Sequence, residues 1–402
     1  MIENCKLAKK YPIGFKSLHW DIFPSNYTET IAETSQWADF RNNGFSSGFD
    51  LGKRGNDNKG PYIVTDHAIV KKTTQRYNSL KAVVGAEFIA SYRISNLGNP
   101  LRCVVNGIEL NPTDLRSIHD AGRILELLKD RQDKALLIVD IGGGLGAVLE
   151  KLKKLFPHAR FISLDLPEVN VVQTWFLGKS YPKARFLTYR DFTADPSSIN
   201  GSDYDFAILP GWCIDQIAEK SVDLFINTRS MMEMTPETIL FYFEHIQRAV
   251  RTDGGFYCVN RYEKSTVGVP VRIKDYPFDN QWVFRISQPA WDQSWIHELA
   301  AFRTEHPLAH SSQSLLAALP PVSWGNVGNA VANVFVMLKA LIWGVHVMVN
   351  PGINGTVQFR FRTAVRWLHN TLAIFVVNNR ILYRTLRPVF RASKSAFRLK
   401  QK

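Results

Sequence analysis

The sequence of 402 residues predicts an α/β fold with a mostly parallel central sheet, and two observations predict it. Short apolar segments alternate with helical patterns of about ten residues, which is typical of right-handed strand–helix–strand units. The first apolar segment ends in a glycine-rich loop, at the kind of junction where open α/β sheets bind ligands. We expect three parts: an N-terminal cap or substrate region (1–120), a catalytic domain (121–305) and a helical C-terminal appendage (306–402).

The expected elements follow from hydrophobic periodicity. Five strands are predicted at residues 136–139, 160–165, 184–189, 222–227 and 256–260. Helices are predicted at residues 114–128, 147–156, 169–177 and 235–250. Thr235 is expected to cap the last of these helices, because Pro236 suits the first helical position. Residues 281–286 could add an edge strand.

The net charge of +13 is concentrated in the C-terminal part of the chain. After Glu305 the sequence holds 12 Lys and Arg and no Asp or Glu, so the preceding residues are nearly neutral. Between Arg380 and Arg398 the basic residues recur at steps of three and four, which places them on one helical stripe. A basic and apolar tail favours an anionic membrane surface over a nucleic acid as partner. The alternative is a helical appendage packed on the catalytic domain.

The cysteine pattern and the N-terminus indicate a cytoplasmic protein, peripheral on the inner face of a membrane if the tail binds lipid. The four cysteines form no CxxC pair, and no cysteine–histidine cluster has the spacing of a zinc site. The first residues lack the apolar segment of a secretory signal. We therefore expect free thiols and no dedicated metal site, although metal dependence of the reaction stays open.

The glycine loop carries the main functional signal, because it reads Asp140-x-Gly142-x-Gly144-x-Gly146. Glycines at a strand–helix junction permit positive φ angles and let a ligand approach the backbone. Asp165 ends the next strand, 19 positions after Gly146. An acid at that place accepts hydrogen bonds from two ribose hydroxyls of an adenosine.

Two cofactors fit a loop of this kind, and Asp140 distinguishes between them. The segment Gly142-x-Gly144-x-x-Ala147 also matches a loose dinucleotide-binding pattern. A carboxylate directly before the loop would repel a pyrophosphate. The same carboxylate would attract the ammonium group of S-adenosylmethionine, which has no phosphate, so the sequence favours S-adenosylmethionine.

Four blocks of the sequence resemble a bacterial family of sugar O-methyltransferases within the class I methyltransferases. These blocks are Val139–Gly144, Leu164–Glu168, Asn227–Met234 and Val259–Tyr262, and the resemblance covers roughly residues 98–291. It implies a Rossmann-like mostly parallel sheet and O-methylation of a saccharide, nucleotide- or lipid-linked, in surface polysaccharide synthesis. In class I enzymes an acid after the third strand helps to hold the adenine amine, and Asp191 occupies that place in this sequence.

A sugar hydroxyl is a poor nucleophile at neutral pH, so methyl transfer to it requires a general base near the strand ends. Glu233 follows the fourth strand by about one turn and is the first candidate, with a salt bridge to Arg229 as the alternative interpretation. His119 is the second candidate, oriented or charged by the adjacent Asp120, with a structural histidine as its alternative.

Polar residues at the ends of the fourth and fifth strands are the candidates for substrate binding. Arg229 and Arg261 could clamp a carboxylate or phosphate of the sugar, or form ion pairs within the fold. Asn227 and Asn260 could bind hydroxyls. Two other functions stay open at this point: methylation of a small natural product, and a non-catalytic methyltransferase-like scaffold at a membrane.

Overall fold

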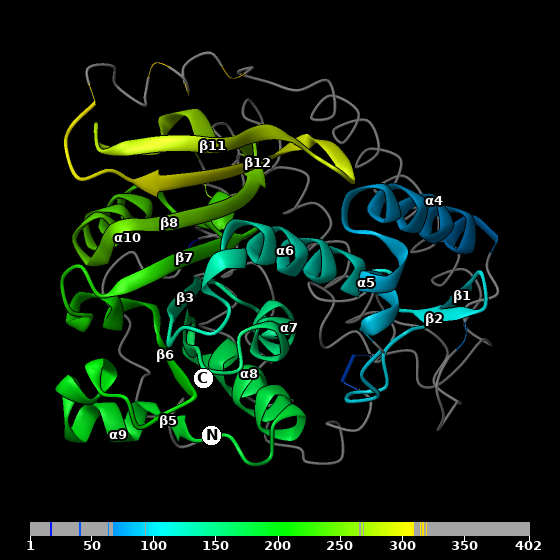
Figure 1. Ribbon diagram of the computed structural model, residues 1–402, viewed down its shortest axis with the longest axis horizontal. Coiled ribbons are helices and arrows are strands. Elements are labelled where there is room, and N and C mark those ends of the chain that lie inside the picture. The colour runs from blue at the N-terminus through cyan, green and yellow to red at the C-terminus, as the bar shows by residue number, and fades with distance from the viewer. Residues whose placement is uncertain are drawn as a thin grey trace, which may run out of the picture.

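The computed structural model describes residues 17, 40–41, 63, 67–92, 94–264, 267, 269–308, 314, 316 and 319 (Figure 1). The predicted basic stripe between Arg380 and Arg398 lies outside these residues. Membrane association therefore stays a prediction, which flotation with anionic liposomes would test. In the part of the chain that the structure describes, no helix has the length and apolar character needed to cross a membrane.

An eight-stranded sheet forms the centre of the molecule, in the order β11-β12-β8-β7-β3-β4-β6-β5. Its strands are β3 (Leu137–Ile141), β4 (Arg160–Asp165), β5 (Phe186–Leu187), β6 (Phe206–Pro210), β7 (Val222–Thr228), β8 (Val250–Arg261), β11 (Trp282–Ala290) and β12 (Gln293–Arg303). Strands β3 to β8 pair in parallel, whereas β12 is antiparallel to both β8 and β11. The predicted α/β fold with a mostly parallel sheet is confirmed.

Helices cover both faces of this sheet, as the strand–helix alternation predicts. One core contains residues of α6 (Asp114–Leu127), α7 (Ala147–Leu155) and α8 (Pro167–Ser180), which lie together in Figure 1. The opposite core contains residues of α9 (Tyr189–Ala194) and α10 (Pro236–Ala249). The central strand β3 is buried along its whole length, which explains its continuous apolar sequence.

A smaller layer precedes the sheet and packs against α6. It consists of α4 (His67–Val84), α5 (Ala86–Ser91) and the hairpin of β1 (Cys103–Val105) and β2 (Ile108–Leu110). Its core includes Leu115 and Ile118 of α6. Because α6 crosses the predicted boundary at residue 120, the N-terminal layer and the sheet share this helix.

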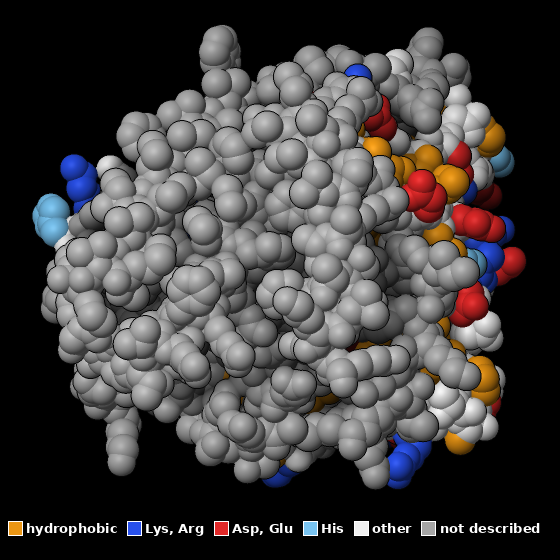
Figure 2. Space-filling model, turned by 180° about the vertical axis from the view of Figure 1, so that it is seen from behind, with side chains coloured by type: hydrophobic (Ala, Val, Ile, Leu, Met, Phe, Trp, Pro, Cys, Tyr) orange, Lys and Arg blue, Asp and Glu red, His pale blue; other side chains and the backbone are white. Residues whose placement is uncertain are grey.

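One short strand pair and the surface side chains complete the description. Strand β9 (Glu263–Lys264) pairs with β10 (Val271–Arg272) beside the end of β8. Along the right-hand edge of Figure 2, hydrophobic, basic and acidic side chains of the described residues are interspersed. This mixture fits the nearly balanced charge of residues 1–305.

Several predicted boundaries are confirmed, and one strand is wrong. Thr235 caps α10 by accepting a hydrogen bond from the Thr238 amide at 3.2 Å. The third predicted strand, residues 184–189, contracts to β5 at the edge of the sheet. Strand β6, which the sequence analysis missed, takes the place beside β4. Its five apolar residues are buried on both faces, so they displace the shorter and more polar segment to the edge.

Candidate active site

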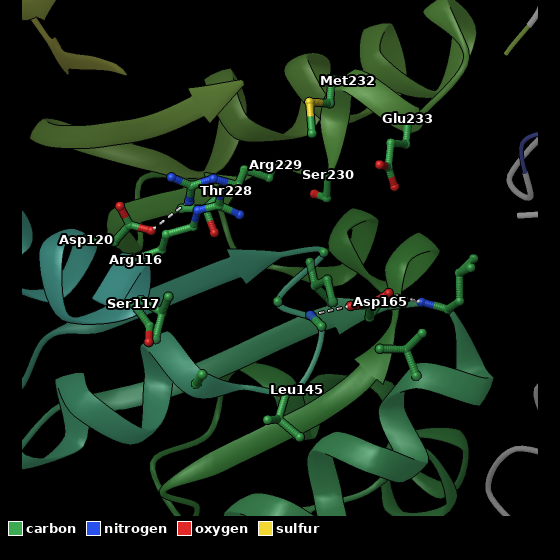
Figure 3. A pocket seen from close by; sticks show the side chains of 18 of the residues that line it. Arg116, Ser117, Asp120, Leu145, Asp165, Thr228, Arg229, Ser230, Met232 and Glu233 are labelled. Carbon is green, nitrogen blue, oxygen red and sulfur yellow. Dashed lines mark hydrogen bonds and ion pairs between the residues drawn. The ribbon is translucent and has the colours of Figure 1, made fainter. Parts of the chain in front are cut away.

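A cavity of about 460 Å³ opens at the carboxyl ends of β3, β4 and β7. Figure 3 shows Asp165 and Glu233 at one end of it and Arg116, Arg229 and Asp120 at the other. Its size falls within the range of small-molecule sites. The parallel strands bring loop residues far apart in sequence to this one edge, as expected for an open α/β sheet.

The glycine loop between β3 and α7 adopts the backbone that its sequence predicts. Gly142, Gly144 and Gly146 have φ angles of 71°, 59° and 86°. A Cβ on Gly142 would lie 2.1 Å from Ser230 Oγ, so glycine is required where the loops after β3 and β7 approach each other. Gly142 and Gly144 line the cavity, but Gly146 serves as the N-cap of α7 and packs against Leu177. Its predicted role in cofactor binding is therefore indirect.

Asp165 lies at the end of β4 and lines the cavity, as predicted. Its carboxylate accepts hydrogen bonds from the Gly144 amide (2.9 Å), the Leu166 amide (2.7 Å) and Gln173 Nε2 (3.2 Å). Burial raises the pKa of Asp165 to about 7, although the two backbone hydrogen bonds lower it. The Asp165 side chain thus connects the glycine loop to the end of β4.

Asp140 is buried behind the glycine loop and does not line the cavity. Neither carboxylate oxygen has a hydrogen-bond partner among the described residues. Burial, with Asp165 and Asp120 nearby, raises the pKa of Asp140 to about 8. A buried carboxylate without partners fits a positively charged ligand, and S-adenosylmethionine carries both a sulfonium and an ammonium group.

The segment after β7 is held by the two asparagines that were predicted to bind hydroxyls, and that prediction is wrong. Asn227 donates to the Ile141 carbonyl at 2.8 Å and accepts from the Met231 amide at 3.1 Å. Asn260 donates to Asn227 Oδ1 at 2.7 Å. Both side chains are fully buried and lie outside the cavity lining. Their amides fix the loop that carries Arg229 and Glu233.

Glu233 lines the cavity, and its ion-pair partner is not the expected Arg229. Lys264, at the end of β9, donates to Glu233 Oε1 instead. Burial lowers the pKa of Lys264, while Glu233 raises it. Arg261 is outside the cavity lining, and its charge interacts with Glu233. The predicted substrate clamp by Arg261 is therefore wrong, because this half-buried side chain does not line the cavity.

His119 does not reach the cavity, so its predicted role as a base is wrong. The imidazole is 1% exposed, and its Nδ1 lies 3.1 Å from Asp120 Oδ1. It lies beside Trp291, with ring centroids 5.5 Å apart, and 3.8 Å from Glu298. The packing of α6 on the sheet turns this side chain toward β12. The neighbouring Asp120 lines the cavity in its place.

Asp191 lies one strand too far from the cavity to hold an adenine amine. Its exposed carboxylate accepts hydrogen bonds from the amide (2.8 Å) and the hydroxyl (2.7 Å) of Thr188. Thr188 is the N-cap residue of α9, and these hydrogen bonds cap that helix. The residue opposite Asp165 in the neighbouring strand is Pro210 of β6. The segment that begins at Gly211 therefore occupies the place assigned to Asp191, because β6 is inserted into the sheet.

Three further charged residues belong to this region, and the sequence analysis did not select them. Arg116 lines the cavity, Lys264 holds Glu233, and Asp292 pairs with Arg116 at 2.7 Å. Arg116 precedes Asp120 by one helical turn, so the predicted helix could have indicated it. Asp292 gave no local signal, because the turn between β11 and β12 brings it to the site.

No group of three or more His, Cys, Asp or Glu side chains in the described part of the chain is placed to hold a metal ion.

Residues 118–195, from α6 to α9, match the model of an O-methyltransferase domain family. No curated protein matches the sequence. Solved structures with partial similarity include a SAM-dependent methyltransferase from Aquifex aeolicus, with 11% identity, a TM-score of 0.30, and coverage of 46% of this chain and 90% of that one. Mitomycin 7-O-methyltransferase MmcR has 15% identity, a TM-score of 0.31, and coverage of 48% and 57%.

The sheet, the glycine loop with Asp165 and the family match together define an enzyme of the class I S-adenosylmethionine-dependent methyltransferases. Its cofactor is S-adenosylmethionine, and the match to the O-methyltransferase family covers residues 118–195.

The raised pKa of Asp165 predicts that cofactor affinity depends on pH. Ribose hydroxyls donate to the ionised carboxylate, so below its pKa of about 7 a proton must be released on binding. We expect the affinity for S-adenosylhomocysteine to rise between about pH 6 and 8, with proton release. Calorimetry in buffers of different ionisation enthalpy measures both quantities. In Asp165→Asn, the part of the pH dependence of the affinity that is due to Asp165 should disappear. If the affinity of this variant changes as steeply with pH as that of the wild type, Asp165 is not the group responsible.

Without ligand, the same group makes the folded protein less stable as pH rises. The folded pKa of about 7 lies above the ordinary value, so the folded state binds more protons between these two values. Its contribution to the free energy of unfolding is present at low pH and is lost as pH rises through about 7.

Proposed function

We propose that this enzyme transfers the methyl group of S-adenosylmethionine to a hydroxyl of a saccharide. The observation that supports the saccharide is the lining of the cavity beyond the glycine loop. Arg116, Ser117, Asp120 and Arg229 contribute charged and hydrogen-bonding groups there. Tyr242 is the only aromatic residue among the described lining residues. A polyhydroxylated ligand needs donors and acceptors of this kind.

The resemblance of Asn227–Met234 and Val259–Tyr262 to bacterial sugar O-methyltransferases supports the same proposal. In the structure these two blocks contact each other through Asn227 and Asn260, beside the cavity. They position the loop that bears Glu233 and Arg229, so the shared sequence lies where the acceptor would bind.

The residues of the cavity have separate roles in the reaction. The cofactor supplies an already activated methyl group, so the protein must align the acceptor oxygen with it. Such positioning can contribute about 7–11 kcal/mol to lowering the barrier. Asp165 and the glycine loop would hold the adenosine. Glu233, oriented by Lys264, accepts the proton of the sugar hydroxyl, since a carboxylate can accept further hydrogen bonds beside that from Lys264.

Methyl transfer to glycans of the source cell tests this proposal. Purified enzyme with radiolabelled S-adenosylmethionine is incubated with glycan, nucleotide-sugar and lipid-linked fractions, and labelled products are identified by mass spectrometry. We expect an O-methylated sugar, and no labelled sugar with Asp165→Ala. Label on an aromatic small molecule and on no saccharide would overturn the saccharide assignment in favour of natural-product methylation. Cofactor binding without any transfer to any fraction would favour a scaffold.

A further inference from the structure

Four basic side chains from three parts of the chain surround one buried carboxylate at the end of the cavity opposite Asp165. We call this group the basic cluster. Lys72 and Arg76 belong to α4, Arg116 to α6 and Arg229 to the loop after β7. The three arginines lie 2.7–3.7 Å from Asp292, and the charge of Lys72 interacts with it. Figure 3 shows Arg116 and Arg229 side by side, next to Asp120.

Asp292 makes one close contact and two long ones within the cluster. Arg116 Nε lies 2.7 Å from Asp292 Oδ2, whereas Arg76 Nη2 and Arg229 Nη2 each lie 3.7 Å from an Asp292 oxygen. Arg229 also contacts Asp120 through Nη1 at 3.2 Å. Arg229 Nε and Nη2 have no hydrogen-bond partner among the described residues. Asp292 Oδ1 also has no hydrogen-bond partner among these residues, so the Arg229 guanidinium retains two donors that Asp292 does not satisfy.

Among the described residues, the cluster also carries more positive charge than its carboxylates neutralise. Lys72, Arg76, Arg116 and Arg229 face two carboxylates, Asp292 and Asp120, and Asp120 also contacts His119. Burial, then Arg229, lowers the pKa of Arg116 to about 10, with Arg76 acting in the same direction. Like charges held this close in a partly buried site repel each other, so an anion would stabilise the arrangement.

Part of this cluster is open to a ligand. Arg116 and Arg229 line the cavity, and their side chains are 25% and 16% exposed. Arg229 also has a left-handed backbone with φ of 62°, held by a 2.7 Å hydrogen bond from its amide to the Val259 carbonyl. A non-glycine residue in this conformation is strained, and such residues are concentrated at functional sites.

We infer that the basic cluster binds the diphosphate of an acceptor whose sugar is attached through a sugar–diphosphate linkage. The inference rests on the proposed function, because it identifies how the saccharide is presented to the cavity. A diphosphate matches the two uncompensated positive charges, whereas the single carboxylate of a uronic acid does not. Its oxygens also suit the planar fork of arginine. A nucleoside diphosphate and a lipid diphosphate share this chemistry.

Binding of inorganic pyrophosphate to the enzyme saturated with S-adenosylhomocysteine tests the cluster directly. We expect calorimetry to show binding that weakens with added salt. Arg116→Gln should weaken it at least about tenfold, since a charge-assisted hydrogen bond is lost. Lys72→Gln should weaken it by a smaller factor, because Lys72 is exposed and acts through charge alone. Lys71→Gln, on the same helix and also exposed, is the matched control and should leave the affinity unchanged.

Two further measurements identify the source of the diphosphate and control for misfolding of the variants. Uridine diphosphate and farnesyl diphosphate represent the nucleotide and lipid sources, and the tighter ligand identifies the source. Arg116→Lys keeps the charge but loses the fork, and should weaken pyrophosphate binding even if Arg116→Gln fails to fold. Unchanged affinity for S-adenosylhomocysteine in each variant confirms an intact cofactor site.

Three results would overturn the inference. Pyrophosphate does not bind, or it binds with equal affinity to the wild type and to both Arg116 variants. The third is that glucuronate binds in a manner that depends on Arg116 while pyrophosphate does not bind. These outcomes are independent of methyl transfer. If pyrophosphate fails to bind while a sugar is methylated, the diphosphate subsite is wrong and the proposed function stands. If pyrophosphate binds through Arg116 while the methyl group reaches no sugar, the proposed function is wrong.

Discussion

Asp165→Ala is expected to abolish useful binding of S-adenosylhomocysteine while the protein stays folded. Each lost hydrogen bond from a ribose hydroxyl to the charged acceptor should cost about 1.5–3 kcal/mol. Two such bonds correspond to a loss of affinity on the order of 10²–10⁴-fold. Because the pKa of Asp165 is raised to about 7, ionisation of this side chain destabilises the folded protein. Its replacement by alanine removes part of that destabilisation, so we expect the variant to fold.

Calorimetry with S-adenosylhomocysteine measures this loss, and thermal unfolding verifies the fold. Asp191→Ala is the matched control, since its carboxylate is exposed, caps α9 and lies outside the cavity lining. It should leave the affinity unchanged. If Asp165→Ala binds as tightly as the wild type, the ribose role is wrong. If Gly144→Val, at a φ of 59°, also binds normally, the whole cofactor site is wrong.

Glu233→Gln is expected to lower turnover at saturating substrate by about 10²–10⁴-fold with little change in cofactor affinity. Glutamine keeps the shape and can still accept from Lys264, but it does not accept a proton from the substrate. An interaction that acts only in the transition state reduces the turnover number and the specificity constant equally. Single-turnover methyl transfer separates this chemical step from product release.

Two variants distinguish a base from a structural carboxylate. Glu237→Gln is the matched control, four residues away and exposed in the first turn of α10, and should retain normal turnover. Lys264→Gln should reduce turnover less than Glu233→Gln, because it releases the carboxylate without removing it. Normal turnover in Glu233→Gln would exclude Glu233 as the base. A large loss in folded His119→Ala would then return that role to His119, against its buried position.

Local sequence patterns were sufficient for four parallel strands of the central sheet and for the loop that defines the cofactor. Apolar segments of four to six residues bounded by turns indicate buried parallel strands, and β3, β4, β7 and β8 lie where these segments predict. The φ angles of Gly142 and Gly144 follow from the absence of a side chain. Asp165 could be placed because the end of a parallel strand determines the edge at which its last residue lies.

The partners of polar side chains depended on packing over long sequence separations. Strand β6 changed the neighbour of β4, which removed Asp191 from the site. The sequence places Asn227 and Asn260 near the ends of two predicted strands. Only the register of β7 with β8 shows that their side-chain amides face each other. Periodicity reports which residues are buried, and it does not report what a buried polar group contacts.

The sequence alone therefore determined an α/β methyltransferase with its glycine loop and ribose acid, because those features depend on local backbone geometry and strand order. The tertiary structure decided which charges share the cavity. Arg116 and Asp292 are separated by 176 residues, yet lie 2.7 Å apart through the packing of α6 beside the turn between β11 and β12. Electrostatic energy depends on distance in space, so a site assembled from distant segments leaves no local pattern in the sequence.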